Sequence, residues 1–138
     1  MKDGWVVDSS IGISWVHADQ STAEADALLR QVDAGPLFMV PALWFVETAY
    51  ILLVLQRRKR ISASDRATYL KSLEGLKLQI DDESPQSAYH AVSDLAEKYG
   101  LTAYDATYLE LALRRKLALA TRDEVLRRAA KSLGLKTL

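Results

Sequence analysis

The chain has 138 residues, of which 49% are hydrophobic, enough for one domain with a substantial core. Lysine and arginine together number 18, as do aspartate and glutamate, so no net charge attracts nucleic acid from a distance. Without cysteine, the chain has neither a disulfide framework nor a thiolate site, which suits a reducing cytosol. We therefore expect one cytoplasmic domain over residues 1–138, in which any contact with nucleic acid depends on local basic patches.

The run from Pro36 to Leu55 is apolar over twenty residues, the length of a membrane-spanning helix. It contains Pro41 near one end and Glu47 near the middle, and a carboxylate at the centre of a bilayer is costly. A strand, a proline break and a buried helix explain the run better. Because the first residues lead directly into an apolar strand instead of a signal peptide, we expect no association with a membrane.

Apolar runs of strand length alternate with segments of helical periodicity along the chain. Strands are expected at 5–7, 37–40, 76–80 and 117–120, with a possible fifth, edge strand at 133–138. Helices are expected at 22–34, from 42 toward 60, at 62–74, at 88–98, at 102–116 and from 121 onward. This alternation predicts an α/β fold with a parallel sheet covered on both faces. We expect four to five strands in this sheet, in the order 3-2-1-4-5.

Two acidic residues follow strands. Asp8 stands at the carboxyl end of the first strand, where open α/β sheets bind ligands, although for this residue alone capping of the next helix is the simpler explanation. Asp123 comes soon after the fourth strand. Glu124 completes a Thr-x-x-Glu capping box with Thr121, which leaves Asp123 without a structural role. Because the expected order places the first and fourth strands side by side, Asp8 and Asp123 should be neighbours at one edge of the sheet.

Two further acidic residues lie in apolar surroundings on helices. Glu47 is the only charged residue in its run, and four apolar residues are expected on its side of the helix: Leu43, Trp44, Tyr50 and Ile51. Pairing with a buried arginine, or exposure to solvent, would also explain this glutamate. Asp105 lies near a helix start, on the inward face marked by Leu109. It follows Thr102 at capping-box spacing, so capping is again the alternative.

Four carboxylates at one place would repel one another and raise each other's pKa values. A hard cation removes this conflict, and an oxygen-only ligand set without cysteine or histidine indicates Mg²⁺ or Mn²⁺ instead of zinc. Such a cation lowers the pKa of a bound water and orients it for in-line attack on a phosphodiester. Whether one metal ion or two are bound stays open.

Other charged runs have simpler explanations. Two basic runs end helices, with Arg57, Arg58 and Arg60 in one and Arg114 and Arg115 in the other. Cations are favoured at helix C-termini in any case, so a solvated helix end and a contact with RNA phosphates remain open alternatives. The acidic run Asp81–Glu83 precedes Ser84 and Pro85, and we expect it to complement a helix N-terminus instead of binding metal.

Four segments occur along the chain as Val6-Val7-Asp8-Ser9-Ser10, Pro41-Ala42-Leu43-Trp44-Phe45-Val46-Glu47, Leu101-Thr102-Ala103-Tyr104-Asp105-Ala106 and Leu119-Ala120-Thr121-Arg122-Asp123. Together and in this order they resemble the PIN domain, with the closest likeness to the VapC toxins of bacterial toxin–antitoxin pairs. The resemblance implies a three-layer α/β/α fold and a Mg²⁺-dependent endoribonuclease, usually a homodimer and inhibited by a VapB-type antitoxin. It also implies a catalytic and metal-binding set of Asp8, Glu47, Asp105 and Asp123, supported by hydrogen bonds from Ser10 and Thr121.

Two other functions compete with an RNA-cleaving toxin. In a non-catalytic binding module the same acids would only cap helices. A phosphoacceptor receiver domain is another parallel α/β fold, but it requires an acidic pair and a late lysine where this chain has a lone Asp8 and the sequence Thr121-Arg122-Asp123. His17 and His90 each stand alone, which gives no support to serine–histidine chemistry. Metal binding would separate the toxin from the binding module.

Overall fold

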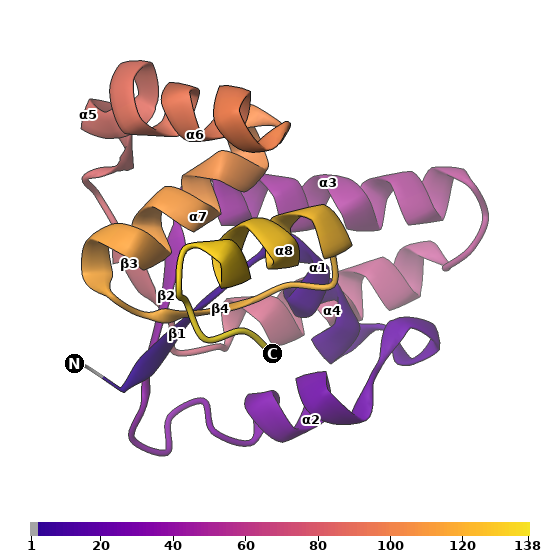
Figure 1. Cartoon of the computed structure of the whole chain (residues 1–138). Coiled ribbons are helices and arrows are strands. Elements are labelled where there is room, and N and C mark those ends of the chain that lie inside the picture. The colour runs from indigo at the N-terminus through magenta and orange to yellow at the C-terminus, as the bar shows by residue number, and fades with distance from the viewer. Residues whose placement is uncertain (1–2) are drawn as a thin grey trace.

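The computed structural model describes residues 3–138 (Figure 1). The elements follow one another along the chain as β1 (Gly4–Val7), α1 (Ser9–Val16), the 3-10 turn η1 (Ala18–Gln20), α2 (Ala23–Leu29), β2 (Leu37–Pro41), α3 (Leu43–Arg57), α4 (Ala63–Glu74), β3 (Gln79–Asp81), α5 (Ser84–Ser87), the π-helical turn η2 (Ala88–Val92), α6 (Ser93–Tyr99), α7 (Ala103–Arg115), β4 (Ala118–Ala120) and α8 (Glu124–Ser132).

The sheet consists of four parallel strands in the order β3-β2-β1-β4. β1 is one of the two inner strands, where Val6 lies opposite Met39 of β2 and Leu119 of β4. All four residues of β1 are buried, because a parallel strand covered on both faces has no polar side. The α/β class and the expected order of the first four strands are therefore confirmed.

The expected fifth strand at 133–138 is reduced to a single contact. Thr137 forms an isolated parallel bridge with Leu119, and the Leu119 amide donates a hydrogen bond of 2.9 Å to the Lys136 carbonyl. After α8 the chain turns at Gly134, which has a φ of 82°. The tail then meets a strand, β4, that is itself only three residues long, so there is little edge on which a further strand can pair.

Helices cover the sheet in two groups (Figure 1). On one side α7 packs against β1, β2 and β4, and α8 packs against α7 and β4. On the other side α1 packs against α2, α3 and α4, and α3 also contacts β2. No helix within residues 3–138 combines the length and the apolarity needed to cross a membrane.

Some element boundaries differ from those expected. α2 ends at Leu29, and the chain continues through turns in which Asp33 has a φ of 66°. β3 lies at Gln79–Asp81, later than expected, where it pairs in register with the last residues of β2. The helix expected at 88–98 starts at Ser84 and contains the π-helical turn η2 before it ends at Tyr99.

α1 and α3 approach each other closely at Gly12. A Cβ atom placed there would lie 2.7 Å from Cζ2 of Trp44, a side chain with no exposed surface. The Trp44 indole Nε1 also donates a hydrogen bond of 3.1 Å to the Asp8 backbone carbonyl. This packing therefore holds the start of α3 against the segment that follows β1.

We predict that Gly12→Ala lowers the free energy of unfolding by about 1–3 kcal/mol, the usual effect of overpacking a core. The new methyl group would overlap the Trp44 ring, which cannot move because it is buried. Denaturant unfolding followed by circular dichroism measures this. Gly75→Ala is the matched control, because a Cβ at that position meets nothing closer than 3.7 Å. Equal stability of the two variants would contradict this account of the packing.

Candidate active site

Asp8 is buried at the edge of the sheet between β1 and β4, with 3% of its surface exposed. Its Oδ1 accepts hydrogen bonds from Ser10 Oγ at 2.6 Å and from the Ile11 amide at 3.2 Å, and its Oδ2 accepts one from Thr121 Oγ1. The bond from Ile11 makes Asp8 the N-cap of α1. A carboxylate offers about four acceptor sites, so these three bonds leave room for one more partner. Asp8 therefore caps a helix and also takes part in the site.

The buried position changes the acidity of Asp8. Burial raises the pKa of this carboxyl from 3.8 to about 6, against the opposing effect of the hydrogen bonds from Ser10, Thr121 and Ile11. The negative charge of Asp105 raises the pKa further. Charge at Asp8 is thus unfavourable unless a positive group joins the site.

Glu47 lies on α3 and is partly buried. Its Oε1 accepts a hydrogen bond of 2.5 Å from the hydroxyl of Tyr108, so this glutamate pairs with a tyrosine and not with a buried arginine. Burial raises the pKa of Glu47, the bond from Tyr108 lowers it, and the charge of Asp105 raises it. Among the residues expected on the same side of the helix as Glu47, Trp44 is buried but Tyr50 is 60% exposed, so this side of α3 is only partly buried.

Asp105 stands in the first turn of α7, where Thr102 is the N-cap. The Asp105 amide donates a hydrogen bond of 3.1 Å to Thr102 Oγ1, but the Asp105 carboxylate accepts none from residues 3–138. Only one of the two hydrogen bonds of a capping box therefore forms, and the Asp105 side chain is available for another partner. Burial raises the pKa of Asp105, and the charge of Asp123 raises it further.

Asp123 is the N-cap of α8, because its Oδ1 accepts a hydrogen bond of 2.9 Å from the Leu126 amide. The expected Thr121–Glu124 capping box does not form, so the argument that left Asp123 without a structural role was wrong. Instead, Thr121 Oγ1 accepts a hydrogen bond of 2.9 Å from the Asp123 amide and donates a hydrogen bond to the Asp8 carboxylate. Thr121 thereby links the end of β4 to the carboxylate that follows β1.

Asp105 is linked to each of the other three carboxylates by an effect of charge on pKa. The charge of Asp105 raises the pKa of both Asp8 and Glu47, and the charge of Asp123 raises that of Asp105. Within residues 3–138, no lysine, arginine or histidine forms an ion pair with any of the four. The same part of the chain contains no group of three acidic, histidine or cysteine side chains close enough to hold a metal ion unaided. The site is therefore a negative cluster without a counter-charge from the protein and without a closed metal cage.

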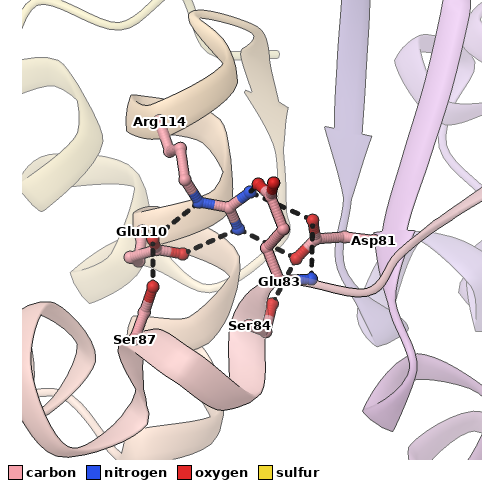
Figure 2. Close-up of polar contacts among 6 residues, drawn as sticks. All are labelled: Asp81, Glu83, Ser84, Ser87, Glu110 and Arg114. Atoms are coloured by element: carbon pink, nitrogen blue, oxygen red, sulfur yellow. Dashed lines mark hydrogen bonds and ion pairs between the residues drawn. The ribbon is translucent and has the colours of Figure 1, made fainter.

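Arg114, in contrast to the four acidic residues of the site, has several partners of opposite charge (Figure 2). Its guanidinium binds Asp81 at 2.8 Å, Glu83 at 2.6 Å and Glu110 at 2.8 Å. Ser84 donates a hydrogen bond to Asp81, and Ser87 donates one to Glu110 (Figure 2). The Asp81–Glu83 run therefore binds an arginine of α7, beyond the role expected for it at a helix start.

The ion pairs of Arg114 affect the predicted contacts between basic residues and RNA. Arg114, expected among the contacts to RNA, has its guanidinium occupied by three carboxylates and is not available to a phosphate in this arrangement. Arg57, Arg58 and Arg60 are exposed at the end of α3, and Arg115 is partly exposed.

The sequence analysis missed Tyr108. It has no exposed surface, and burial together with the charges of Glu47 and Asp8 raises the pKa of its phenol, which stays neutral and able to donate. One signal was present in the sequence. Tyr108 follows Asp105 by three residues, so both belong to one face of the helix.

A family model for the PIN domain matches residues 5–132, which is most of the chain. The protein belongs to the PIN domain family.

Solved structures resemble the whole chain. PAE2754 from Pyrobaculum aerophilum has a TM-score of 0.71 and 23% identity, covering 99% of this chain and 92% of that one. VapBC2 from Rickettsia felis, bound to a DNA fragment from its promoter, has a TM-score of 0.65 and 12% identity, covering 97% and 96%. VapC20 from Mycobacterium tuberculosis, a toxin that cleaves the sarcin-ricin loop, has a TM-score of 0.57 and 16% identity, covering 91% and 95%. At these identities the likeness is one of fold. No curated protein matches the sequence significantly.

We predict that Asp8 lowers the free energy of unfolding of the metal-free protein by about 3 kcal/mol, relative to Asp8→Asn, as the pH rises from about 4 to about 6. The folded state holds the Asp8 proton more tightly than the unfolded chain, so the contribution is full below the unfolded value of 3.8 and is lost above about 6. Asp8→Asn, which cannot titrate, should flatten this part of the profile. Denaturant unfolding in chelator at several pH values measures it, and a wild-type profile that rises over this range relative to that of Asp8→Asn would contradict the prediction.

Proposed function

We propose that this protein is a Mg²⁺- or Mn²⁺-dependent endoribonuclease and the toxin of a type II toxin–antitoxin pair. The observation that carries the proposal is the cluster of Asp8, Glu47, Asp105 and Asp123, which has no counter-charge from the described part of the chain. Membership of the PIN domain family and a fold shared with VapC20, a toxin that cleaves the sarcin-ricin loop, support it.

The donor chemistry of the cluster fits a hard divalent cation. All four side chains offer oxygen, and the Asp105 carboxylate accepts no hydrogen bond from residues 3–138. Mg²⁺ keeps several waters and is usually held by only one or two carboxylates, so it does not require a closed three-acid cage. Asp8, Glu47, Asp105 and Asp123 would therefore hold the ion, some directly and the others through its waters.

Different residues of the chain would orient the Asp8 carboxylate, accept a proton and contact the RNA. A bound cation would supply positive charge that favours ionisation of a water and offsets the charge that develops on the phosphate. Ser10 and Thr121 orient the Asp8 carboxylate through their hydroxyl groups. One of the four carboxylates would accept the proton of the attacking water. The exposed Arg57, Arg58 and Arg60 are candidates for contacts with RNA phosphates, which a chain without net charge needs locally.

We predict that Asp8→Asn and Asp105→Asn each reduce RNA cleavage by more than the roughly 10- to 100-fold that follows loss of a supporting contact to a metal ligand. Each removes a ligand charge from the cluster, while the loss of repulsion leaves the fold intact. Cleavage of single-stranded or loop RNA is measured with Mg²⁺ or Mn²⁺ and again after addition of chelator, which should abolish it.

Asp94→Asn is the matched control, because Asp94 is an exposed acid on α6. The wild-type protein should also arrest the growth of a bacterial host, whereas the two site variants should not. Undiminished cleavage by both site variants would rule out the site. A wild-type protein without metal-dependent cleavage would favour the binding-module alternative, in which Asp8 and Asp123 act only as the helix caps that they also are.

A VapB-type antitoxin is the proposed partner, and the likeness to VapBC2 supports it at the level of fold. We also propose a homodimer, because α3 exposes large apolar side chains. Phe45 is 39% exposed, Val46 73% and Tyr50 60%. Such side chains in one surface region are typical of protein–protein contacts.

We predict that the wild-type protein sediments as a dimer and that Val46→Lys sediments mainly as a monomer. A lysine on the apolar face of α3 would bring an unpaired charge into the interface. Sedimentation velocity at several concentrations measures this. Thr68→Lys, at an exposed position of α4, is the control and should remain dimeric. A wild-type monomer at every concentration would contradict the homodimer.

A further inference from the structure

Tyr108 connects two of the helices that carry acidic residues of the site. It lies on α7 three residues after Asp105, and its hydroxyl reaches Glu47 Oε1 on α3 at 2.5 Å. The two partners are 61 positions apart in the chain, so the contact exists only in the folded protein. Among residues 3–138, no other side chain donates a hydrogen bond to the Glu47 carboxylate.

The surroundings of Glu47 show why such a contact matters. Its neighbours Phe45 and Val46 are exposed, so this part of α3 lies at the protein surface. A glutamate has several rotatable bonds and loses conformational freedom when it is held in one orientation. A partly buried glutamate at this place can therefore turn either toward the acidic cluster or toward water.

Tyr108 favours the inward orientation. Its ring has no exposed surface and is packed in the core, so the position of its hydroxyl is set by the fold and not by the flexibility of a side chain. The hydrogen bond occupies only Oε1, which leaves Glu47 Oε2 for another partner. Contacts of this kind, made to a ligand and not to the metal, orient metal-binding side chains in many proteins.

We propose that Tyr108 is a positioning residue, which holds Glu47 in the acidic cluster in the orientation needed to bind a divalent cation. This inference rests on the proposed metal-dependent function and adds a residue outside its four carboxylates. It acts through one hydroxyl group, so Tyr108→Phe removes the contact and keeps the buried ring.

The test is Mn²⁺ binding to the metal-free protein, measured by electron paramagnetic resonance without RNA. Tyr108→Phe should weaken binding roughly 10-fold or more, as expected for loss of an outer contact to a metal ligand. Tyr104→Phe is the matched control, because Tyr104 lies on the same helix but is 63% exposed. It loses the same hydroxyl group from a tyrosine and should bind Mn²⁺ as the wild type does.

A double-mutant cycle separates positioning from general loosening of the fold. If Tyr108 acts through Glu47, adding Tyr108→Phe to Glu47→Gln should change Mn²⁺ binding little. An equal loss in both backgrounds, or wild-type binding by Tyr108→Phe, would overturn the inference. Loss of the cooperative thermal unfolding transition in Tyr108→Phe would also overturn it, in favour of a structural role.

The same measurements distinguish this inference from the proposed function. Weaker Mn²⁺ binding by Tyr108→Phe in a protein that cleaves no RNA would uphold the positioning role and reject the endoribonuclease. Cleavage and Mn²⁺ binding that are both unaffected by Tyr108→Phe would reject only the positioning role. A wild-type protein that binds no Mn²⁺ would reject both.

Discussion

The buried carboxylate of Asp8 is the constraint on which the rest of the site depends. Taking a charge out of water is costly, and residues 3–138 offset this cost with three hydrogen bonds and no cation. These bonds come from Ser10 and Ile11 at the start of α1 and from Thr121 after β4. Holding this one group therefore requires β1 and β4 to be neighbours, which is what the parallel sheet provides.

Asp81 and the acidic cluster around Asp105 differ in the partners that the protein provides for their charges. Asp81 ends β3 and is buried, but Arg114 and Ser84 bind it, so its charge is neutralised within the protein. The cluster around Asp105 receives no such partner from the described residues. The charge of Asp105 raises the pKa of Asp8 and of Glu47, and the charge of Asp123 raises that of Asp105. Residues 3–138 supply an arginine to the three carboxylates around Arg114 and none to the four of the cluster, which leaves those four suited to a cation from solution.

Helix capping by an acidic residue does not exclude a role for it in the proposed site. Asp8 caps α1 and Asp123 caps α8, yet both also contribute charge to the site. A carboxylate offers about four acceptor sites, so accepting a backbone amide leaves sites for other partners. Capping also ties each acid to the first turn of a helix that begins just after a strand. The position of the carboxylate is thus set by the sheet.

Sequence patterns determined the fold class and the positions of the acids relative to the strands, because burial on both faces leaves apolar runs and helices leave a period of 3.6 residues. They could not show that Glu47 pairs with Tyr108, that Arg114 binds Asp81, or that Asp123 caps α8 in place of Glu124. The first two contacts join residues 61 and 33 positions apart, and a pattern of local periodicity carries no information about partners at such separations. The third depended on where α8 begins. The Thr121 hydroxyl accepts a hydrogen bond from the Asp123 amide and donates one to Asp8, which is possible only when β1 and β4 lie side by side. Local spacing therefore placed the acids on their elements, whereas the packing of those elements decided which partner each side chain has.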